Sequence, residues 1–394
     1  MAIADAAVIS DDAASDIQHL LAEEHGDWEA AKLGAETEFA SDACYERTAP
    51  SDAKWQAEWR EFERILKTES RHFSRQLTSR LAAVFTALEG HITSNGTAVV
   101  ATAGPDTGLR NLYRARVFQS DEGLRKALMR PDVELGPPPP TLALAGRMNA
   151  RGISVFYGAN SEAVAIAEVR PPVGSSVVTA SFEILRPLRL LDLSAAMSTA
   201  AEGSVFDESH SDRMAHAMFL RSLCKKMTRP IMPSDESMEY LATQAIADYL
   251  ATEHEPKLDG IMYPSVQVNG SGINIVLFHG SSRVESLNLP PGVTLDVSFG
   301  HDTMDGWEDD YSVTEQIPPE TNTDGTVGRL SIRPEEFGDH DDVDYDGRLT
   351  VLRVDTTSVN VHHVFATQVH YHSSVVQRYR WRKEVENPIA FDPY

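Results

Sequence analysis

Gly146-Arg147-Met148-Asn149-Ala150-Arg151-Gly152, with its continuation to Glu168, is the stretch around which the rest of the chain is organised. A short β-type run, 153–159, is followed by an alanine-rich helical run that ends at Glu168. A cation (Arg147), an aromatic ring (Tyr157) and a carboxylate thus lie ten and eleven residues apart. Polar groups at the ends of apolar elements are a common way to build a pocket. An ordinary scaffold explains the same pattern equally well.

Helical and strand patterns interleave on both sides of this stretch, between residues 110 and 285. Strand patterns occur at 112–118, 178–184 and 274–278, and helical patterns at 210–227 and 235–253. Such interleaving is typical of one α/β or α+β domain. We therefore predict an α+β fold.

Two arginines share one face of the first of these strands. Arg114 and Arg116 alternate with Tyr113, which points to the other face. A strand face with two guanidinium groups is either exposed to solvent or a wall for an anion, and spacing alone does not decide between them.

The flanking regions differ in texture from this centre. Residues 1–50 are rich in Ala, Asp and Glu, which predicts a poorly ordered acidic leader. Residues 51–108 carry apolar side chains at three- and four-residue steps, which predicts an N-terminal helical region. Residues 287–394 combine short strand-like runs with acidic loops, so we predict a small β-rich C-terminal appendage beyond a core domain at 109–286.

The composition narrows the classes of function. The 394 residues carry a formal charge of −24, which argues against a general nucleic-acid binder because that affinity depends on cations meeting phosphates. Two distant cysteines, Cys44 and Cys224, rule out a disulfide scaffold and fit a reducing cytoplasm. No signal peptide and no run long enough to span a bilayer is apparent, so we expect a cytoplasmic protein without membrane contact.

Common motifs for other chemistries are missing from the sequence. It contains no dinucleotide-binding glycine fingerprint, phosphate-cradling loop or serine nucleophile elbow. Asp342, Asp344 and Asp346 resemble the start of a calcium loop, but Arg353 stands where the bidentate glutamate is needed. Four histidines near the end, at 362, 363, 370 and 372, lack a completing carboxylate or cysteine pattern. We therefore expect no metal site.

Several ordered segments together resemble the RES-domain family, named for an Arg, a Glu and a Ser. The segments are Leu112-Tyr113-Arg114, Gly146-Arg147-Met148-Asn149 with Gly152, Tyr157-Gly158-Ala159, Ala165-Ile166-Ala167-Glu168, Asp259-Gly260-Ile261 with Tyr263-Pro264-Ser265, and Asn274-Ile275-Val276-Leu277-Phe278. No single piece is specific, but their order and spacing agree with the family over residues 112–278. The resemblance implies a fold similar to ADP-ribosyltransferase toxins, and members that degrade NAD by hydrolysis or phosphorolysis, many paired with an antitoxin.

The resemblance also implies roles for individual residues. Arg114 and Arg147 would bind and orient NAD, Tyr157 would stack on the nicotinamide or its ribose, and Glu168 would bind ribose hydroxyls and offset the developing cation. Ser265 would add a hydrogen bond within the pocket. The catalytic set is then Arg147, Tyr157, Glu168 and Ser265, and the NAD-binding set is Tyr113, Arg114, Asn149, Gly152 and Asn274.

The resemblance therefore implies an NAD-consuming enzyme that acts as a bacterial toxin or defence effector. NAD is the substrate rather than a tightly bound cofactor, and water or inorganic phosphate is the acceptor. Transfer of ADP-ribose to a macromolecule, and a non-enzymatic module that binds NAD or a partner, are the alternatives. The N-terminal helices and the acidic C-terminal region depart from the small family toxins, which leaves room for an antitoxin or regulatory partner and for self-assembly.

Overall fold

The computed structural model describes most of the chain. The described residues are 2–7, 9–35, 39, 50–71, 73–86, 88, 93, 96–199, 209–232, 234–268, 271–318, 346–369 and 371–381.

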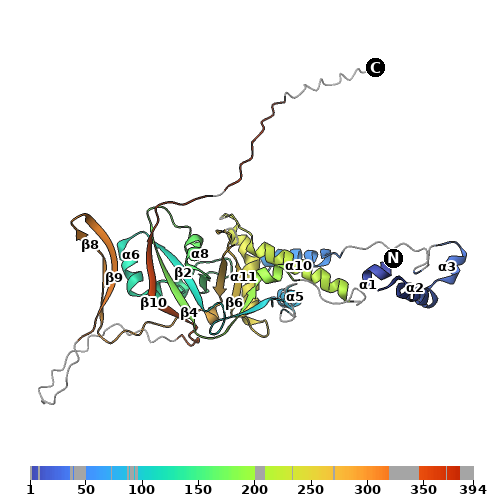
Figure 1. Cartoon of the computed structure of the whole chain (residues 1–394), viewed down its shortest axis with the longest axis horizontal. Coiled ribbons are helices and arrows are strands. Elements are labelled where there is room, and N and C mark those ends of the chain that lie inside the picture. Colours follow the sequence, from blue (N-terminus) through green and yellow to red (C-terminus); the bar gives the residue numbers. More distant parts are fainter. Residues whose placement is uncertain are drawn as a thin grey trace, which may run out of the picture.

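A mixed sheet forms the centre of the fold (Figure 1). Its strands are β1 (Val100–Ala103), β2 (Asn111–Phe118), β3 (Phe156–Ala159), β4 (Ser176–Ile184), β5 (Leu188–Asp192), β6 (Gly260–Pro264), β7 (Ile273–Leu277) and β10 (Leu352–His363). They lie in the order β1-β5-β6-β7-β3-β2-β4-β10, with β5 and β6 parallel and all other neighbours antiparallel. Together with the helices, this sheet confirms the predicted α+β class.

The junction between β2 and β3 is the weakest pairing in the middle of the sheet. Only Tyr113 and Ala159 are paired there, whereas β2 pairs with β4 along all eight of its residues. Since strands that diverge after one pair cannot fill the space between them with a hydrogen-bonded ladder, this junction leaves room for a cavity.

Side chains that alternate along the strands pack into two hydrophobic cores, one on each face of the sheet. Leu191, Ile261 and Val276 belong to one cluster, and their chain neighbours Leu190, Met262 and Ile275 belong to the other. This period of two is what a sheet covered on both faces requires.

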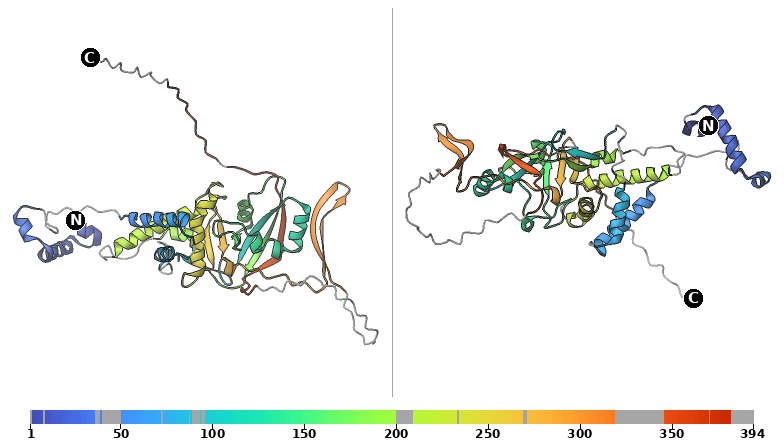
Figure 2. Two further views of the ribbon diagram at one scale, coloured as in Figure 1. Left: turned by 180° about the vertical axis from the view of Figure 1, so that it is seen from behind. Right: turned by 90° about the horizontal axis from the view of Figure 1, so that it is seen from below.

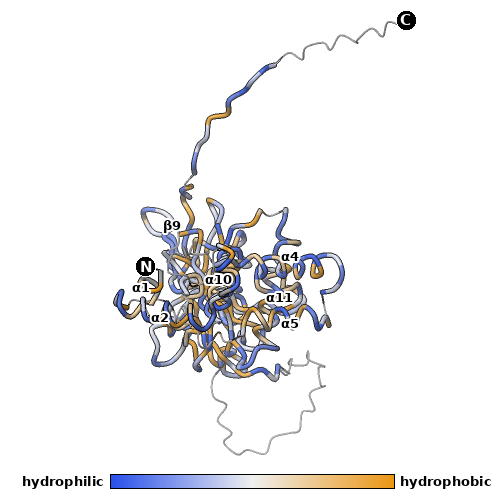
Figure 3. The backbone as a smooth tube through the Cα atoms, turned by 90° about the vertical axis from the view of Figure 1, so that its right-hand side faces the viewer, coloured by the Kyte–Doolittle hydropathy of each residue, from blue (hydrophilic) through white to orange (hydrophobic). Residues whose placement is uncertain are grey.

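Four long helices cover the first face. They are α4 (Ala53–Thr68), α5 (Arg75–Phe85), α10 (His210–Thr228) and α11 (Glu236–Thr252), and Figure 3 shows α4, α5 and α11 gathered on one side when the molecule is viewed along its long axis. Trp59, Phe62 and Phe219 are almost fully buried among them. Each such side chain contributes roughly 1.5–3 kcal/mol on burial, so these helices and the sheet form one packed unit.

Shorter elements complete the core domain. On the other face lie α6 (Asp121–Met129) and α7 (Pro131–Glu134), while α8 (Glu162–Glu168) packs on β2, β3 and β4 in a third, smaller cluster. The remaining short elements are α9 (Leu193–Met197) and the two 3₁₀ turns η2 (Pro140–Leu142) and η3 (His279–Ser281). Within the described residues, no helix combines the length and apolar character that crossing a membrane requires.

The described part of the first fifty residues, for which the sequence predicts a poorly ordered acidic leader, contains three helices. The helices are α1 (Ala2–Ala7), α2 (Asp11–His25) and α3 (Trp28–Lys32). Ser10 caps α2 by accepting a hydrogen bond from the Ala13 amide, and Asp27 caps α3 by accepting from the amides of Glu29 and Ala30. Such caps satisfy amides that the first helical turn leaves without partners.

Both outer strands of the sheet lie outside the expected 109–286 core. β1 comes from the end of the expected N-terminal helical region, and β10 comes from the expected C-terminal appendage. Within the described part of that appendage, the hairpin of β8 (Thr294–Thr303) and β9 (Gly306–Gln316) forms a separate two-stranded sheet. In both views of Figure 2 this hairpin lies at one end of the molecule and α1–α3 at the other.

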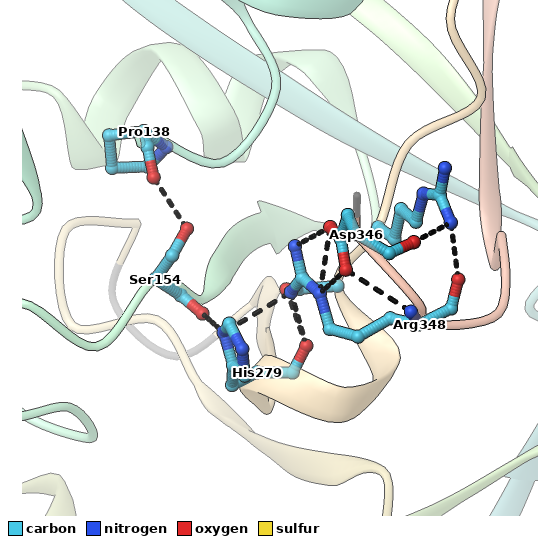
Figure 4. Close-up of polar contacts among 7 residues, drawn as sticks. Pro138, Ser154, His279, Asp346 and Arg348 are labelled. Carbon is cyan, nitrogen blue, oxygen red and sulfur yellow. Dashed lines mark hydrogen bonds and ion pairs between the residues drawn. The ribbon is translucent and has the colours of Figure 1, made fainter. Parts of the chain in front are cut away.

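A polar cluster fixes the chain where it enters β10 (Figure 4). The Ser154 hydroxyl donates to the Pro138 carbonyl at 2.5 Å, and the Nδ1 atom of His279 lies 3.0 Å from the Ser154 carbonyl oxygen. Arg348 donates to the His279 carbonyl at 2.6 Å and forms an ion pair with Asp346. Asp346 is thus engaged by a guanidinium group, while Asp342 and Asp344 lie outside the described residues.

Candidate active site

A cavity of about 410 Å³ lies where β2 and β3 diverge. Its lining includes Tyr113 and Arg114 of β2, Tyr157 of β3, Glu168 of α8, Glu236 and Tyr240 of α11, Tyr263 of β6, Asn274 of β7, and Gly146 and Arg147 of the loop before β3. Six elements and one loop therefore converge on it. A cavity of this size, with aromatic walls and a few convergent polar groups, is the usual form of a small-molecule site.

Glu168 ends α8 and is anchored through one carboxylate oxygen. Its Oε1 atom accepts a hydrogen bond from the Ser265 hydroxyl at 2.5 Å and another from the Asn274 side-chain amide at 2.7 Å. Ser265 is fully buried behind the carboxylate and Asn274 nearly so. Among the described residues Oε2 has no hydrogen-bond partner, so one oxygen is fixed and the other is available to a ligand.

Arg147 is oriented by the end of helix α10. Its Nη1 atom donates to the carbonyl oxygens of Met227 and Arg229 at 2.5 and 2.9 Å, where the last turn of the helix leaves carbonyls without helical partners. The guanidinium also lies 5.4 Å from the centre of the Tyr240 ring, a cation–π distance. These contacts hold the cation at the wall of the cavity.

Helix α11 fixes the backbone of the same loop. The Thr243 hydroxyl donates to the Arg147 carbonyl at 2.5 Å, and the Gln244 amide donates to the Gly146 carbonyl at 2.8 Å. A Cβ atom on Gly146 would lie 2.6 Å from the Tyr157 hydroxyl oxygen, closer than real contacts allow. The position therefore requires glycine.

Tyr157 ties β3 to this loop. Its hydroxyl donates to the Asn149 Oδ1 atom at 2.8 Å and accepts from the Met148 amide at 3.2 Å. Burial, partly offset by the hydrogen bond from Met148, raises the pKa of Tyr157 to about 12. The phenol is therefore neutral near pH 7 and is excluded as a general base there.

Arg114 is the cavity's least satisfied cation. Its Nη1 atom is buried and has no hydrogen-bond partner among the described residues, and the guanidinium lies 4.9 Å from the centre of the Phe156 ring. Burial, followed by the charge of Arg116, lowers the pKa of Arg114 to about 10. It still carries its charge at neutral pH, so an anion in the cavity would meet an uncompensated cation.

Seven of the nine predicted site residues meet around this cavity. Tyr113, Arg114, Arg147, Tyr157, Glu168 and Asn274 line it, and Ser265 supports Glu168 from behind. Of the two arginines on β2, Arg114 faces the cavity, whereas Arg116 is exposed and pairs with Glu134.

Asn149 and Gly152 do not line the cavity. The buried Asn149 amide donates to the carbonyls of Leu144, Ala150 and Ile153 within the loop, and its Oδ1 atom accepts from Tyr157. Gly152 has a φ of +86°, in the region that favours glycine, and its amide bonds to Ala143. Both residues shape the loop that carries Arg147, so their predicted role as NAD contacts finds no support in this geometry.

Sequence reasoning missed two aromatic walls and one carboxylate. Tyr240 and Glu236 lie on α11 one turn apart, beside the apolar stripe that identified the helix. Tyr263 was noticed only as part of the Tyr-Pro-Ser segment. The pKa of Tyr263 is raised above its usual range, and burial is the largest cause. The sequence offered one signal for Tyr240: it lies beside the apolar stripe of the predicted helix and not within it, which is a position from which a side chain can line a cavity.

From the histidines near the end of the chain and from the acidic loop before them, the sequence predicts no metal site. Among the described residues, no group of three or more His, Cys, Asp or Glu side chains is arranged to hold a metal ion. His362 and His363 lie on β10, where His362 contacts Glu162 and His363 contacts Tyr311.

Comparison with protein families gives one match. The model of the RES domain matches residues 111–315, slightly more than half of the 394 residues. The chain belongs to the RES domain family. This domain is ADP-ribosyltransferase-like, and membership indicates an enzyme that acts on NAD. Neither the search of curated proteins nor that of solved structures finds a match.

The match extends beyond the segments that first suggested it. It includes both strands of the β8–β9 hairpin except the last residue of β9, and it stops before β10. All the residues that line the cavity lie within it. The cavity therefore lies within the matched domain, whereas both edge strands of the sheet, β1 and β10, lie outside the match.

Proposed function

We propose that this RES domain cleaves the bond between nicotinamide and ribose in NAD, with water or inorganic phosphate as the acceptor. The observation that carries the proposal is the carboxylate of Glu168, which is held through Oε1 by Ser265 and Asn274 and has no partner at Oε2 among the residues that the structure describes. A carboxylate with one fixed and one free oxygen can bind ribose hydroxyls in a single orientation.

The charge that develops in this reaction matches the charges around the cavity. As the bond to the nicotinamide nitrogen breaks, its electron pair leaves with a neutral nicotinamide and positive charge develops on the ribose. A fixed carboxylate favours that charge more in the transition state than in bound NAD, which is the condition for catalysis. The oxygen of water or phosphate then forms the new bond to the ribose carbon, and the proton of the acceptor is released.

The remaining walls support recognition of the substrate. NAD carries a pyrophosphate, and Arg114 and Arg147 offer guanidinium forks that suit its oxygens. Tyr157, Tyr240 and Tyr263 offer aromatic faces for a planar ring. Binding an anion at Arg114 would also relieve the cost of its buried, unpartnered nitrogen.

A product analysis tests the proposal. Purified full-length protein is incubated with NAD, with and without inorganic phosphate, while nicotinamide, ADP-ribose, ADP-ribose-1″-phosphate and labelled macromolecule are measured. Hydrolysis predicts ADP-ribose in both conditions, and phosphorolysis predicts the phosphate ester only when phosphate is present.

Two results would contradict the proposal. Label transferred to the protein itself or to added macromolecules, with no free ADP-ribose product, would establish ADP-ribosyl transfer instead. Unchanged NAD under every acceptor condition, together with measurable NAD binding, would indicate a binding module. Glu162→Gln, at the opposite end of the same helix, is the matched control for Glu168→Gln.

A further inference from the structure

The 364–381 segment leaves the body of the molecule as an extended chain. It follows β10 directly, and its described residues form neither helix nor strand (Figures 1 and 2). Its large apolar side chains are nevertheless fully open to water: Phe365, Val369, Tyr371, Val375, Val376, Tyr379 and Trp381 are each at least 70% exposed. A series of exposed apolar and aromatic side chains indicates a surface that another part of a protein covers.

The sequence of the segment has the period of a β-strand. From 369 to 381, the odd positions hold Val369, Tyr371, Val375, Tyr379 and Trp381 together with Ser373 and Gln377. The even positions hold His370, His372, Arg378 and Arg380 together with Ser374 and Val376. Figure 3 shows hydrophobic and hydrophilic stretches alternating along it. One face of such a strand would be apolar and the other basic. Residues 364–381 contain no acidic residue.

The β8–β9 hairpin carries the opposite charge. Residues 294–316 contain seven acidic residues, Asp296, Asp302, Asp305, Glu308, Asp309, Asp310 and Glu315, and no Lys or Arg. Within the described residues β9 pairs only with β8, and an isolated two-stranded sheet is marginal without further packing. Its outer edge offers backbone groups that an added strand can pair with.

A cavity with both apolar and polar walls lies beside this acidic hairpin. It measures about 520 Å³, and its apolar lining includes Val313 of β9, Val359 and Val361 of β10, and Leu128 and Pro131 of α6 and α7. Ser312, Glu315, Thr356 and Asn360 are among its polar lining residues. Arg125 of α6 holds the hairpin nearby by donating to the Val297 carbonyl at 2.5 Å. Valines within a cavity next to an acidic strand are complementary to a strand that carries apolar and basic side chains.

We propose that the 364–381 segment of one copy docks on the β8–β9 hairpin of a second copy. Its apolar side chains enter the cavity between β9 and β10, and Arg378 and Arg380 face the hairpin carboxylates. Each copy has one segment and one hairpin, so reciprocal docking satisfies both in a twofold dimer. The length is suitable, since residues 369–381 can follow the whole of β9, which has 11 residues.

The chemistry favours a second copy over another protein as the occupant. The chain as a whole has a charge of −24, and the segment supplies a stretch without acidic residues that is both apolar and basic. A foreign basic peptide at the hairpin would leave the apolar face of the segment open to water. Exchange between copies covers both surfaces at once.

Mixing two charge-reversed variants tests this arrangement. One variant carries Arg378→Glu and Arg380→Glu, which makes the segment acidic. The other carries Glu308→Arg, Asp309→Arg, Asp310→Arg and Glu315→Arg, which changes the charge of residues 294–316 from −7 to +1. In each variant alone the segment and hairpin have the same sign of charge, so we expect dimerisation to weaken at least about tenfold. Mixed in equal amounts, each segment meets a hairpin of opposite charge, and a heterodimer should form.

Sedimentation velocity on the full chain measures the dimer, with one variant carrying a fluorescent label to detect the heterodimer. Lys54→Glu with Arg60→Glu on exposed positions of α4 makes the same change of charge elsewhere and should leave the dimer intact. A wild-type protein that stays monomeric at tens of micromolar overturns the proposal, as does a dimer that neither variant weakens.

Limited trypsin digestion of the wild type then tells apart the ways in which the proposal fails. A monomer whose Arg378 and Arg380 resist cleavage would show that the segment folds back on its own hairpin. A monomer that is cut readily at both positions would show that neither its own hairpin nor a second copy covers the segment.

Discussion

The two ends of helix α8 carry two glutamates with similar hydrogen bonds and different surroundings. At the C-terminal end, Glu168 Oε1 accepts from Ser265 and Asn274. At the N-terminal end, Glu162 Oε1 accepts from Thr179 and from Asn360, and His362 Nε2 lies 3.1 Å away. Both carboxylates are anchored through one oxygen by side chains from distant parts of the chain.

The difference lies in what faces each carboxylate. Glu168 opens into a cavity with four tyrosines and two arginines, whereas Glu162 bridges α8 to β4 and β10 outside it. The hydrogen bond from Thr179, the largest cause, lowers the pKa of Glu162. An anchored carboxylate is therefore not sufficient for a candidate catalytic site. The site also needs a cavity with cations that can bind the rest of the ligand.

Replacing each glutamate by glutamine should separate the two roles most strongly. Glu168→Gln keeps the shape but removes the charge that favours the developing ribose cation. We expect NAD turnover to fall by roughly 10²–10⁴-fold. Glu162→Gln should change turnover less than about twofold. Steady-state release of nicotinamide measures both, and equal losses in the two variants would contradict the assignment.

Arg114 and Arg116 extend the comparison to cations on one strand. Arg114→Met should raise KM for NAD by roughly 10–100-fold, since a charge-assisted contact is lost. The same change should raise the melting temperature, because it removes a buried nitrogen atom that has no hydrogen-bond partner in the described structure. Arg116→Met, two residues away at an exposed position, should change neither the KM for NAD nor the melting temperature. A fall in stability for Arg114→Met would show that the guanidinium is structural.

The local sequence was sufficient to predict the loop, strand and helix that line the cavity, but not how these elements contact one another. The spacing of Arg147, Tyr157 and Glu168 reflects loop, strand and short helix, which local pattern predicts well. The sequence does not reveal that Asn149 and Gly152 lie away from the cavity lining, because a loop-shaping residue and a ligand-binding residue look alike without their contacts. Asn149 donates only to carbonyls of its own loop, which no spacing rule reveals.

The edges of the fold depended on pairings between distant residues. β10 joins β4 across more than 160 residues, with a register shift between Asp355 and Asn360 that interrupts its alternation. The sequence therefore shows this region as short strand-like runs and not as one long edge strand of the central sheet. By contrast, the capping residues Ser10 and Asp27 were visible in the sequence, and the helices they begin could have been predicted.

Removing the anchors of Glu168 should have a smaller effect than removing its charge. Ser265→Ala and Asn274→Ala each leave one donor on Oε1, so we expect kcat to fall about tenfold in each with KM little changed. The double variant should lose more than the two single losses combined, because the donors share one acceptor. Ser271→Ala, whose exposed hydroxyl bonds only to Val268, is the control. Strict additivity would contradict a shared anchoring role.

The smallest expected effect concerns the stability that Glu162 contributes. Because its pKa is lowered in the folded protein, this contribution is fully present above the ordinary glutamate pKa and is lost as pH falls through the lowered value. Glu162→Gln should therefore cost about 1 kcal/mol at pH 7 and progressively less toward pH 3. Urea unfolding at several pH values measures the difference from wild type. A difference that grows toward low pH would mean that the carboxylate opposes folding, and that β10 is held to α8 by other contacts.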